Sequence, residues 1–272
     1  MHLKRIITSL IAFPLLSLLI LKGSVGLFTL FIALVSIIAL YEYFHIVFSD
    51  KTSSIFSPVA LWGGCCGLLL IFTAYVHSFQ MMTGVVVVNL LGAAVLSMTR
   101  YKTDAGILED VQKEIQGVVY IPLTLSFIVL LRHDSHGVAW IFFLIFMVFA
   151  GDVGAFYAGK LFGRHKLSPS ISPGKTIEGS IGGMILCILV GYGFARLFLP
   201  HLNGWSVFLL FIFVNIISQI GDLFESELKR TARIKDSGNI LPGHGGILDR
   251  IDALLFAAPV AYFFKVLVQG GI

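Results

Sequence analysis

Charged residues and glycines are concentrated in the stretch Ser218–Asp252, which lies between two apolar runs. This stretch holds six of the fifteen acidic residues of the chain and five of its nineteen basic residues. The chain is 57% hydrophobic and only 12% charged, and acidic groups at a membrane boundary are costly to place. We therefore expect the chemistry of the protein to depend on this stretch.

Four aspartates are candidate metal ligands. Asp222 lies near the end of one apolar run, Asp249 and Asp252 begin the next, and Asp152 interrupts an earlier run. Carboxylates that converge from separate helices supply the hard oxygen ligands that Mg²⁺ prefers. Any one acid could instead pair with a nearby Lys or Arg, but Asp222 and Asp249 together flank a basic loop. We predict that Asp222 and Asp249 bind Mg²⁺, as one or two cations, with Asp152 and Asp252 as further candidate ligands.

Basic side chains beside these acids predict a phosphate site. Lys229 and Arg230 directly follow the acid-bearing run, and Lys175 precedes another apolar run. A bound cation and basic side chains together neutralise phosphoryl oxygens. The alternative is a basic loop that touches anionic lipid headgroups, and this alternative suits Arg164 and Lys166 better than Lys229 and Arg230.

Two glycine-containing segments could also bind an anion. In Pro242–Gly246, glycines allow backbone N–H groups to approach an anion closely, and His244 could be an acid, a phosphate donor or a structural residue. In Ser172–Gly179, the order Gly-Lys-Thr resembles a P-loop, but Pro169 stands where the first glycine is needed and no strand is expected before it. We reject the P-loop and expect a loop that enters a helix N-terminus, with Lys175 on a phosphate.

The elements that position these residues are membrane helices. The apolar residues come in runs of about 20, the length of an α-helix that crosses a bilayer. Open sheets are excluded in lipid because their edges leave backbone groups unpaired. The predicted fold class is therefore all-α, a polytopic transmembrane helical bundle with about nine spans. The expected spans are 6–21, 25–47, 55–76, 83–99, 117–132, 137–162, 178–199, 204–226 and 252–269.

The basic residues are distributed unequally over the two sides of these spans. Fifteen of the nineteen lie on the side of the N-terminus and four on the other side. Because cytoplasmic loops carry an excess of Lys and Arg, we expect the N-terminus in the cytoplasm and the C-terminus outside. The long polar loops 100–116, 163–177 and 227–251 then face the cytoplasm. These loops account for the net charge of +4, so we expect no nucleic-acid partner.

The charged stretch resembles a known signature. The residues that carry the resemblance are Ser226-x-Leu228-Lys229-Arg230 and, after four further residues, Lys235-Asp236-x-Gly238-x-x-Leu241-Pro242-x-His244-Gly245-Gly246-x-x-Asp249-Arg250-x-Asp252. Over 27 positions this pattern is similar to the signature of the phosphatidate cytidylyltransferases, also called CDP-diacylglycerol synthases. The segment 151–179 is similar to a second block of that family, usually written with SPKKT, from which Gly174 departs. Residues 1–115 resemble the family only as a run of membrane spans.

The resemblance implies a multi-pass enzyme of the cell inner (cytoplasmic) membrane, with its active site facing the cytoplasm. Its substrates would be CTP and phosphatidic acid, its products CDP-diacylglycerol and pyrophosphate, and its cofactor Mg²⁺. By position, the metal ligands match Asp222 and Asp249. The catalytic candidates are Lys229, Arg230, Lys235, Ser226, His244 and Lys175. The substrate-binding candidates are Lys175, Thr176, Lys229, Arg230, Gly245, Gly246 and Arg250.

The predicted organisation is a single integral membrane domain, 1–272, embedded in the lipid bilayer. We expect 1–115 to supply the N-terminal spans and 116–272 to form the catalytic half, with the signature at 218–252. Glycine pairs four residues apart allow helices to approach closely. These pairs include Gly159 with Gly163 and Gly179 with Gly183. Packing within the chain is the simpler explanation for each pair, and a homodimer stays open.

The implied reaction explains why the charged stretch contains no nucleophilic triad. The phosphate of the lipid would itself attack, and it is largely dianionic at neutral pH because its second pKa is near 6. The obstacle is repulsion between two anions, which a cation and basic side chains relieve. One alternative is a cation-coupled transporter with Asp152 and Asp222 as ion ligands, which leaves the loop 227–251 unexplained. The other is a CTP-using enzyme that acts on a different lipid phosphate.

Overall fold

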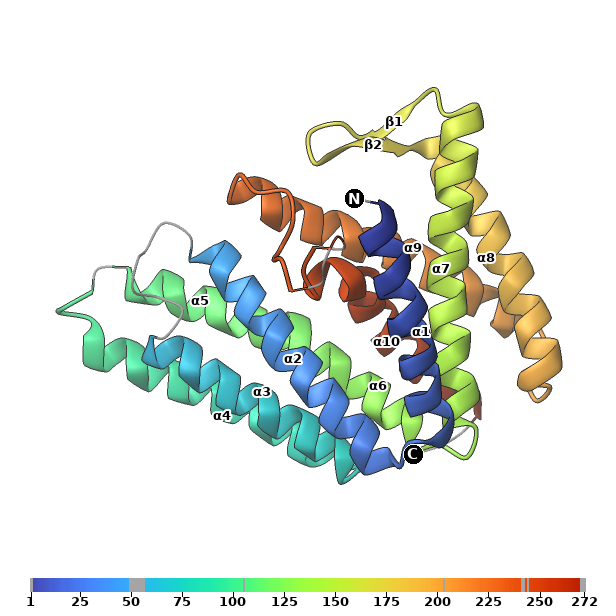
Figure 1. The fold of residues 1–272 in the computed structure, drawn as a ribbon. Helices are drawn as coiled ribbons and strands as arrows, with labels where there is room; N and C mark the ends of the chain where they lie inside the picture. The colour runs from blue at the N-terminus through green and yellow to red at the C-terminus, as the bar shows by residue number, and fades with distance from the viewer. Residues whose placement is uncertain are drawn as a thin grey trace. The chain divides into compact units, whose positions relative to one another are not determined.

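The computed structural model describes residues 2–48, 57–104, 106–202, 204–240, 243 and 245–269, and this part of the chain is predominantly helical. Figure 1 shows long helices and the small β1–β2 hairpin. In chain order the elements are α1 His2–Lys22, α2 Val25–Val47, α3 Pro58–Tyr75, α4 Phe79–Arg100, α5 Ile107–Val118, the π-helical turn η1 Val119–Leu123, α6 Thr124–Arg132, α7 Gly137–Phe162, β1 Lys166–Ser168, β2 Ser172–Thr176, α8 Ile177–Phe198, α9 Trp205–Thr231 and α10 Leu248–Gln269.

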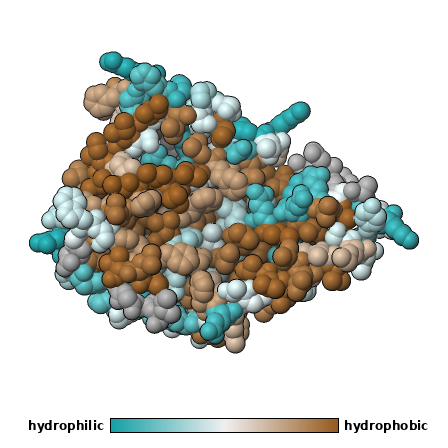
Figure 2. All heavy atoms as spheres, turned by 180° about the vertical axis from the view of Figure 1, so that it is seen from behind, coloured by the Kyte–Doolittle hydropathy of each residue, from teal (hydrophilic) through white to brown (hydrophobic). Residues whose placement is uncertain are grey.

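Among the described residues, eight helical segments are long and apolar enough to cross a membrane. They correspond to the second to ninth expected spans, and the apolar part of α1, Ala12–Lys22, lies where we expected the first. Figure 2 shows apolar residues over broad areas of the surface, as lipid contact requires. The prediction of an all-α polytopic membrane protein is confirmed.

The fifth span begins earlier than the sequence indicated. It runs from Ile107 to Arg132, because α5, η1 and α6 follow one another without a break. The side chains of Ile107, Val111 and Val118 are buried on one face of α5. An ion pair of 2.7 Å joins Lys113 Nζ to Glu109 Oε1 on its more exposed side. The prediction of a loop at 100–116 was therefore wrong for most of its length. The charged residues of this segment suggested a loop, but they belong to an amphipathic helix.

A two-stranded antiparallel hairpin is the second difference from the sequence prediction. Strands β1 and β2 pair Lys166 with Thr176 and Ser168 with Ser172, inside the expected loop 163–177. The segment that resembled a P-loop is therefore itself a strand. It leads directly into α8, whose N-terminus is capped by the Thr176 hydroxyl, which accepts a hydrogen bond of 3.1 Å from the Gly179 N–H.

The chain divides into two compact units. The N-terminal unit comprises Met1–His133 and Thr231–Arg250, and the C-terminal unit comprises Asp134–Arg230 and Ile251–Ile272. The structure thus places the signature residues 231–250 with the N-terminal helices, and the expected division of roles at residue 115 stays a prediction. In the N-terminal unit, the buried Tyr43 donates its hydroxyl to the Lys113 carbonyl at 3.0 Å and links α2 to α5.

In the C-terminal unit, α7 and α8 lie side by side and glycines line their contact (Figure 1). A Cβ atom at Gly154 would come within 2.7 Å of the Gly182 carbonyl oxygen, and one at Gly183 within 2.6 Å of the Gly151 carbonyl oxygen. Only glycine permits so close an approach of two helix backbones. The tight pair holds the hairpin at one end and presents Asp152 from α7.

Candidate active site

The last turns of α9 gather the charged residues predicted from the sequence. Asp222, Ser226 and Lys229 are four and three residues apart, a spacing that brings them to one side of a helix. The Ser226 hydroxyl donates to Asp222 Oδ1 at 3.5 Å. Lys229 Nζ lies 2.5 Å from Glu225 Oε2, and the two side chains are only 12% and 1% exposed. The sequence predicted Lys229 as a phosphate ligand but not its buried ion pair with Glu225.

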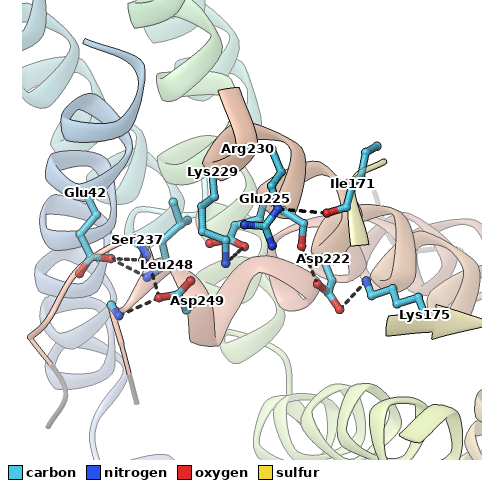
Figure 3. Close-up of polar contacts among 12 residues, drawn as sticks. Glu42, Ile171, Lys175, Asp222, Glu225, Lys229, Arg230, Ser237, Leu248 and Asp249 are labelled. Atoms are coloured by element: carbon cyan, nitrogen blue, oxygen red, sulfur yellow. Dashed lines mark hydrogen bonds and ion pairs between the residues drawn. The ribbon is translucent and has the colours of Figure 1, made fainter. Parts of the chain in front are cut away.

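The β1–β2 hairpin brings a base to this helix. Lys175 Nζ, from β2, lies 2.7 Å from Asp222 Oδ2, and both side chains are partly exposed. Arg230 Nε donates to the carbonyl oxygen of Ile171, in the turn of the hairpin, at 3.3 Å (Figure 3). The hairpin is therefore tied to α9 at both of these points. The predicted proximity of Lys175 to an acid-bearing helix agrees with this geometry.

Two further carboxylates approach Asp222. Asp152 on α7 and Asp252 on α10 each interact electrostatically with Asp222, and Asp152 does so with Lys175 as well. The backbones of α9 and α10 are close there, since a Cβ atom at Gly221 would lie 2.7 Å from the Asp252 carbonyl oxygen. Asp152 is exposed although it lies within a membrane span. An acid in that position requires water or a polar ligand beside it.

This group of side chains suits a hard divalent cation in its chemistry. Asp152, Asp222 and Asp252 offer oxygen atoms only, and Lys175 is the one base that the contacts above place against Asp222. In the described part of the chain, no group of three or more His, Cys, Asp or Glu side chains is arranged so that it could by itself hold a metal ion, as such a cage would. Mg²⁺ does not need such a cage, because it usually takes one or two carboxylates and completes its shell with water and substrate phosphates.

The other predicted metal ligand, Asp249, belongs to the N-terminal unit and is held by backbone groups. Its Oδ2 atom accepts hydrogen bonds from the N–H of Ser237 at 2.9 Å and of Gly246 at 2.8 Å (Figure 3). These bonds fix the carboxylate in the first turn of α10, three residues before Asp252.

Glu42 on α2 contacts the same loop and was missed by the sequence prediction. It accepts hydrogen bonds from Ser237, Ile247 and Leu248, and its side chain is buried. The available signal was an acid inside the apolar run 25–47. That signal could not identify its partners, because two of the three are backbone N–H groups about two hundred residues further along the chain.

The remaining predicted catalytic and substrate-binding residues differ in exposure and in hydrogen bonding. Lys235 and Arg250 are exposed, and Gly245 has a positive φ of 82° that favours glycine. The N–H of Gly246 is donated to Asp249, so a substrate contact of Gly246 would need other atoms. Thr176 caps α8 and is buried. His244 lies outside the described residues, and the substrate contacts of the whole set stay predictions.

The two basic residues that we expected to contact lipid lie at the base of the hairpin. The N–H of Arg164 donates to Glu178 Oε2 at 3.0 Å, and Lys166 Nζ donates to the Pro173 carbonyl oxygen at 2.7 Å. Both residues are exposed. These contacts lie within the hairpin and the start of α8, whereas Lys175 contacts Asp222 on α9.

Comparison with known proteins yields relatives along the whole chain. A sequence model described as the Cytidylyltransferase family matches residues 3–268. A phosphatidate cytidylyltransferase of Bacillus subtilis (strain 168) is 33% identical over 274 residues, which cover 97% of this chain and 97% of the relative. One of Brucella suis biovar 1 (strain 1330) is 35% identical over 263 residues, which cover 96% and 92%. One of Staphylococcus epidermidis is 42% identical over 146 residues, which cover 54% and 55%.

Proposed function

The chain belongs to the cytidylyltransferase family, and on that premise we propose that it is a phosphatidate cytidylyltransferase. It transfers the cytidylyl group of CTP to phosphatidic acid and forms CDP-diacylglycerol and pyrophosphate, a step of phospholipid biosynthesis. The observation that carries the proposal is the likeness, over nearly the whole chain, to relatives of that name. These relatives are named as transferases, so the transporter alternative gains no support from them.

The chemical step needs no nucleophile from the protein. An oxygen of the lipid phosphate forms a bond to the α-phosphorus of CTP, and the bond from that phosphorus to the pyrophosphate oxygen breaks. The attacking phosphate is largely dianionic at neutral pH. The task of the site is therefore to bring two anions together and to stabilise the charge that develops on the departing pyrophosphate.

The basic side chains are suited to that task. Lys175, Lys229 and Arg230 lie on or against α9, within the unit that carries Asp222, and would bind phosphoryl oxygens. The residues that we propose to act in catalysis remain Ser226, Lys175, Lys229, Arg230, Lys235 and His244. Thr176, Gly245, Gly246 and Arg250 complete the proposed substrate contacts.

Mg²⁺ is the proposed cofactor, as one or two cations. Asp222 and Asp249 would hold it, with Asp152 and Asp252 as further candidate ligands. When bound, the cation would neutralise phosphoryl oxygens of CTP and of the departing pyrophosphate. Lys175 already pairs with Asp222, which supports the view that this carboxylate attracts a cation.

The protein is a multi-pass membrane protein, and we propose the cell inner membrane as its location. The site would face the cytoplasm, where CTP is present, with the N-terminus inside and the C-terminus outside. The lipid substrate would approach from the bilayer, since its phosphate lies at the membrane boundary. A homodimer stays a prediction.

The decisive experiment incubates purified protein with labelled CTP and Mg²⁺ in three parallel lipid arms. The arms contain phosphatidic acid, an isoprenoid monophosphate and diacylglycerol, which lacks the phosphate. We expect label in a liponucleotide and release of pyrophosphate only with phosphatidic acid. Product with the isoprenoid arm alone would mean a different lipid substrate. No turnover of CTP in any arm, with correctly folded protein, would refute the proposal.

The metal ligands are tested by Asp222→Asn and Asp249→Asn. Each removes one negative charge, and we expect kcat to fall by about 10²-fold or more. Both variants should fold, because a partly exposed ion pair such as Asp222–Lys175 contributes only about 1 kcal/mol and an asparagine oxygen can still accept from Ser237 and Gly246. Glu227→Gln, an exposed acid on α9, is the matched control and should retain activity. Near-normal activity of either aspartate variant across a Mg²⁺ titration would exclude it as a ligand.

A further inference from the structure

Glu42 is a buried acid in a membrane span, and its hydrogen bonds go to the signature loop. Its side chain lies on α2 and is 2% exposed. Oε2 accepts from the Ser237 hydroxyl at 3.1 Å and from the Leu248 N–H at 2.8 Å, and Oε1 accepts from the Ile247 N–H at 3.1 Å (Figure 3). Two of these donors belong to the N-terminus of α10, where backbone N–H groups and the helix dipole favour an anion.

Two glycines of the signature make room for this carboxylate. A Cβ atom at Gly238 would lie 2.5 Å from Glu42 Oε1, and a Cβ atom at Gly246 would lie 2.5 Å from Glu42 Oε2. Neither glycine has a positive φ, unlike Gly243 and Gly245. A Cβ atom at Gly246 would also collide with the Ser237 hydroxyl oxygen, which donates to Glu42. The absence of side chains at 238 and 246 thus leaves space for Glu42 and Ser237, and neither position requires glycine for its backbone conformation.

The bonds of Glu42 alternate with those of Asp249. Ser237 donates its hydroxyl to Glu42 and its N–H to Asp249. Along the other arm of the loop, Gly246 donates to Asp249, and Ile247 and Leu248 donate to Glu42. A shift of either carboxylate would thus move donors that the other one needs, so the two side chains are mechanically coupled.

We infer that Glu42 is a positioning residue of the active site, which holds Ser237, Gly246 and the first turn of α10 so that Asp249 keeps one orientation. The inference rests on the proposed function, because it assigns a purpose to the orientation of Asp249. It also gives the N-terminal spans a part in catalysis, although the signature itself lies far along the chain.

The main test is the isosteric variant Glu42→Gln, assayed for turnover of CTP with phosphatidic acid. An amide has one acceptor oxygen, so its NH₂ group would face a donor and at least one hydrogen bond would be lost. We expect kcat to fall about 10–100-fold, as for residues that orient metal ligands. KM for CTP should stay within about threefold, because Glu42 supports the site without a contact to substrate.

A second variant separates positioning from general loss of fold. Ser237→Ala removes the hydroxyl donor to Glu42 but keeps the N–H donor to Asp249. If the two residues act through one arrangement, the double variant should lose less than the product of the single losses. Ser36→Ala, another buried polar residue of α2, is the control and should keep kcat within about twofold. Independent, multiplicative losses would count against the inference.

Binding of Mn²⁺, followed by the electron paramagnetic resonance of the free ion, supplies a readout that does not need activity. We expect Glu42→Gln to weaken Mn²⁺ binding about tenfold relative to Ser36→Ala. If the parent turns over no CTP but this difference appears, the proposed function fails and the positioning of Asp249 stands. If the parent is active and Glu42→Gln changes neither kcat nor Mn²⁺ binding, the inference is overturned.

Discussion

At the scale of single residues, Arg230 and Lys166 each donate a hydrogen bond to a backbone carbonyl oxygen, but we expect only Arg230 to bind substrate. Arg230 Nε donates to the Ile171 carbonyl oxygen, and Lys166 Nζ donates to the Pro173 carbonyl oxygen. Both are exposed, and both bind the backbone of the hairpin or its turn. Only Arg230 belongs to the charged end of α9 that carries Asp222. Both side chains hold the hairpin, so a comparison of the two isolates the further role in phosphate binding that we propose for Arg230.

We predict that Arg230→Ala lowers kcat/KM for CTP by about 10²–10³, the usual cost of a charged donor that acts in the transition state. Lys166→Ala should stay within a few-fold of the parent, because loss of a lipid-surface charge costs only about 1 kcal/mol of membrane attraction. Steady-state kinetics at saturating Mg²⁺ measure both variants. Equal and mild losses would mean that the basic residues anchor the loop and that the phosphates bind elsewhere.

Lys229 is a less direct test than its position suggests, because it pairs with the buried Glu225. Removal of one partner of a buried ion pair typically costs about 3–5 kcal/mol, so Lys229→Ala would lower stability as well as activity. Its kinetic effect has to be read beside a thermal unfolding midpoint. Arg230 is exposed, so we expect Arg230→Ala to change activity without a comparable loss of stability.

At the scale of elements, the contact of α7 with α8 depends on where each glycine lies. A Cβ atom at Gly182 would collide with the Cβ of Ala158 and lie 3.1 Å from the Gly154 carbonyl oxygen. At Gly193, on the same helix, a Cβ atom would have no neighbour within 4 Å. Two identical substitutions in α8 should therefore have opposite effects.

We predict that Gly182→Ala destabilises the protein by about 1–3 kcal/mol, since overpacking forces the two helices apart. Gly193→Ala should be neutral or stabilising by up to about 1 kcal/mol, because alanine favours the helix. Thermal unfolding in detergent compares them directly. A loss of stability in Gly193→Ala as large as that in Gly182→Ala would show that glycine content, and not helix contact, decides the effect.

The sequence predicted the long apolar helices well and the shorter amphipathic elements poorly. Runs of about 20 apolar residues have no other stable form in lipid, so seven of the eight spans were predicted to within about five residues, and only the fifth begins much earlier than predicted, at Ile107. The segment from Ile107 to Gln116 was taken for a loop because it carries four charges, one of which is the buried Glu114. The hairpin was missed because its strands are three and five residues long and one contains Pro173 and Gly174.

The charged residues of the candidate site could be predicted, because charged residues are rare in this chain. Their backbone partners could not be predicted from the sequence. Asp222, Lys175 and Asp249 stand out because few charged residues occur in so apolar a chain. The contact of Lys175 with Asp222 depends on the hairpin, which no helical periodicity reveals. Glu42 has backbone N–H partners, and every residue except proline offers such a group.

At the scale of the whole molecule, the distribution of bases predicts which loops face the cytoplasm. Fifteen of nineteen basic residues fall on one side if the chain crosses the membrane nine times. The connection after α4 and the hairpin then lie on the cytoplasmic side, and the connection between α6 and α7 lies outside. Lys102, Ser170 and Ser135 are exposed in these three segments.

We predict that cysteines introduced by Lys102→Cys and Ser170→Cys react with an impermeant maleimide only from the cytoplasmic face, and Ser135→Cys only from the outside. The background should lack Cys65, Cys66 and Cys187, which are free thiols. Inverted and right-side-out vesicles provide the two faces. Labelling of positions 102 and 170 from opposite faces would contradict the nine-span arrangement.

The hydrogen bonds of Glu42 also set an order of events during synthesis of the protein. Its partners Ile247 and Leu248 follow it by 205 and 206 residues, so at about 5–20 residues per second they leave the ribosome roughly 10–40 s later. Through that interval α2 carries a carboxylate whose final donors do not yet exist, in a membrane where such a group is costly. A nascent chain that stops before the last helix would therefore keep a costly acid in α2 without its backbone donors from Ile247 and Leu248.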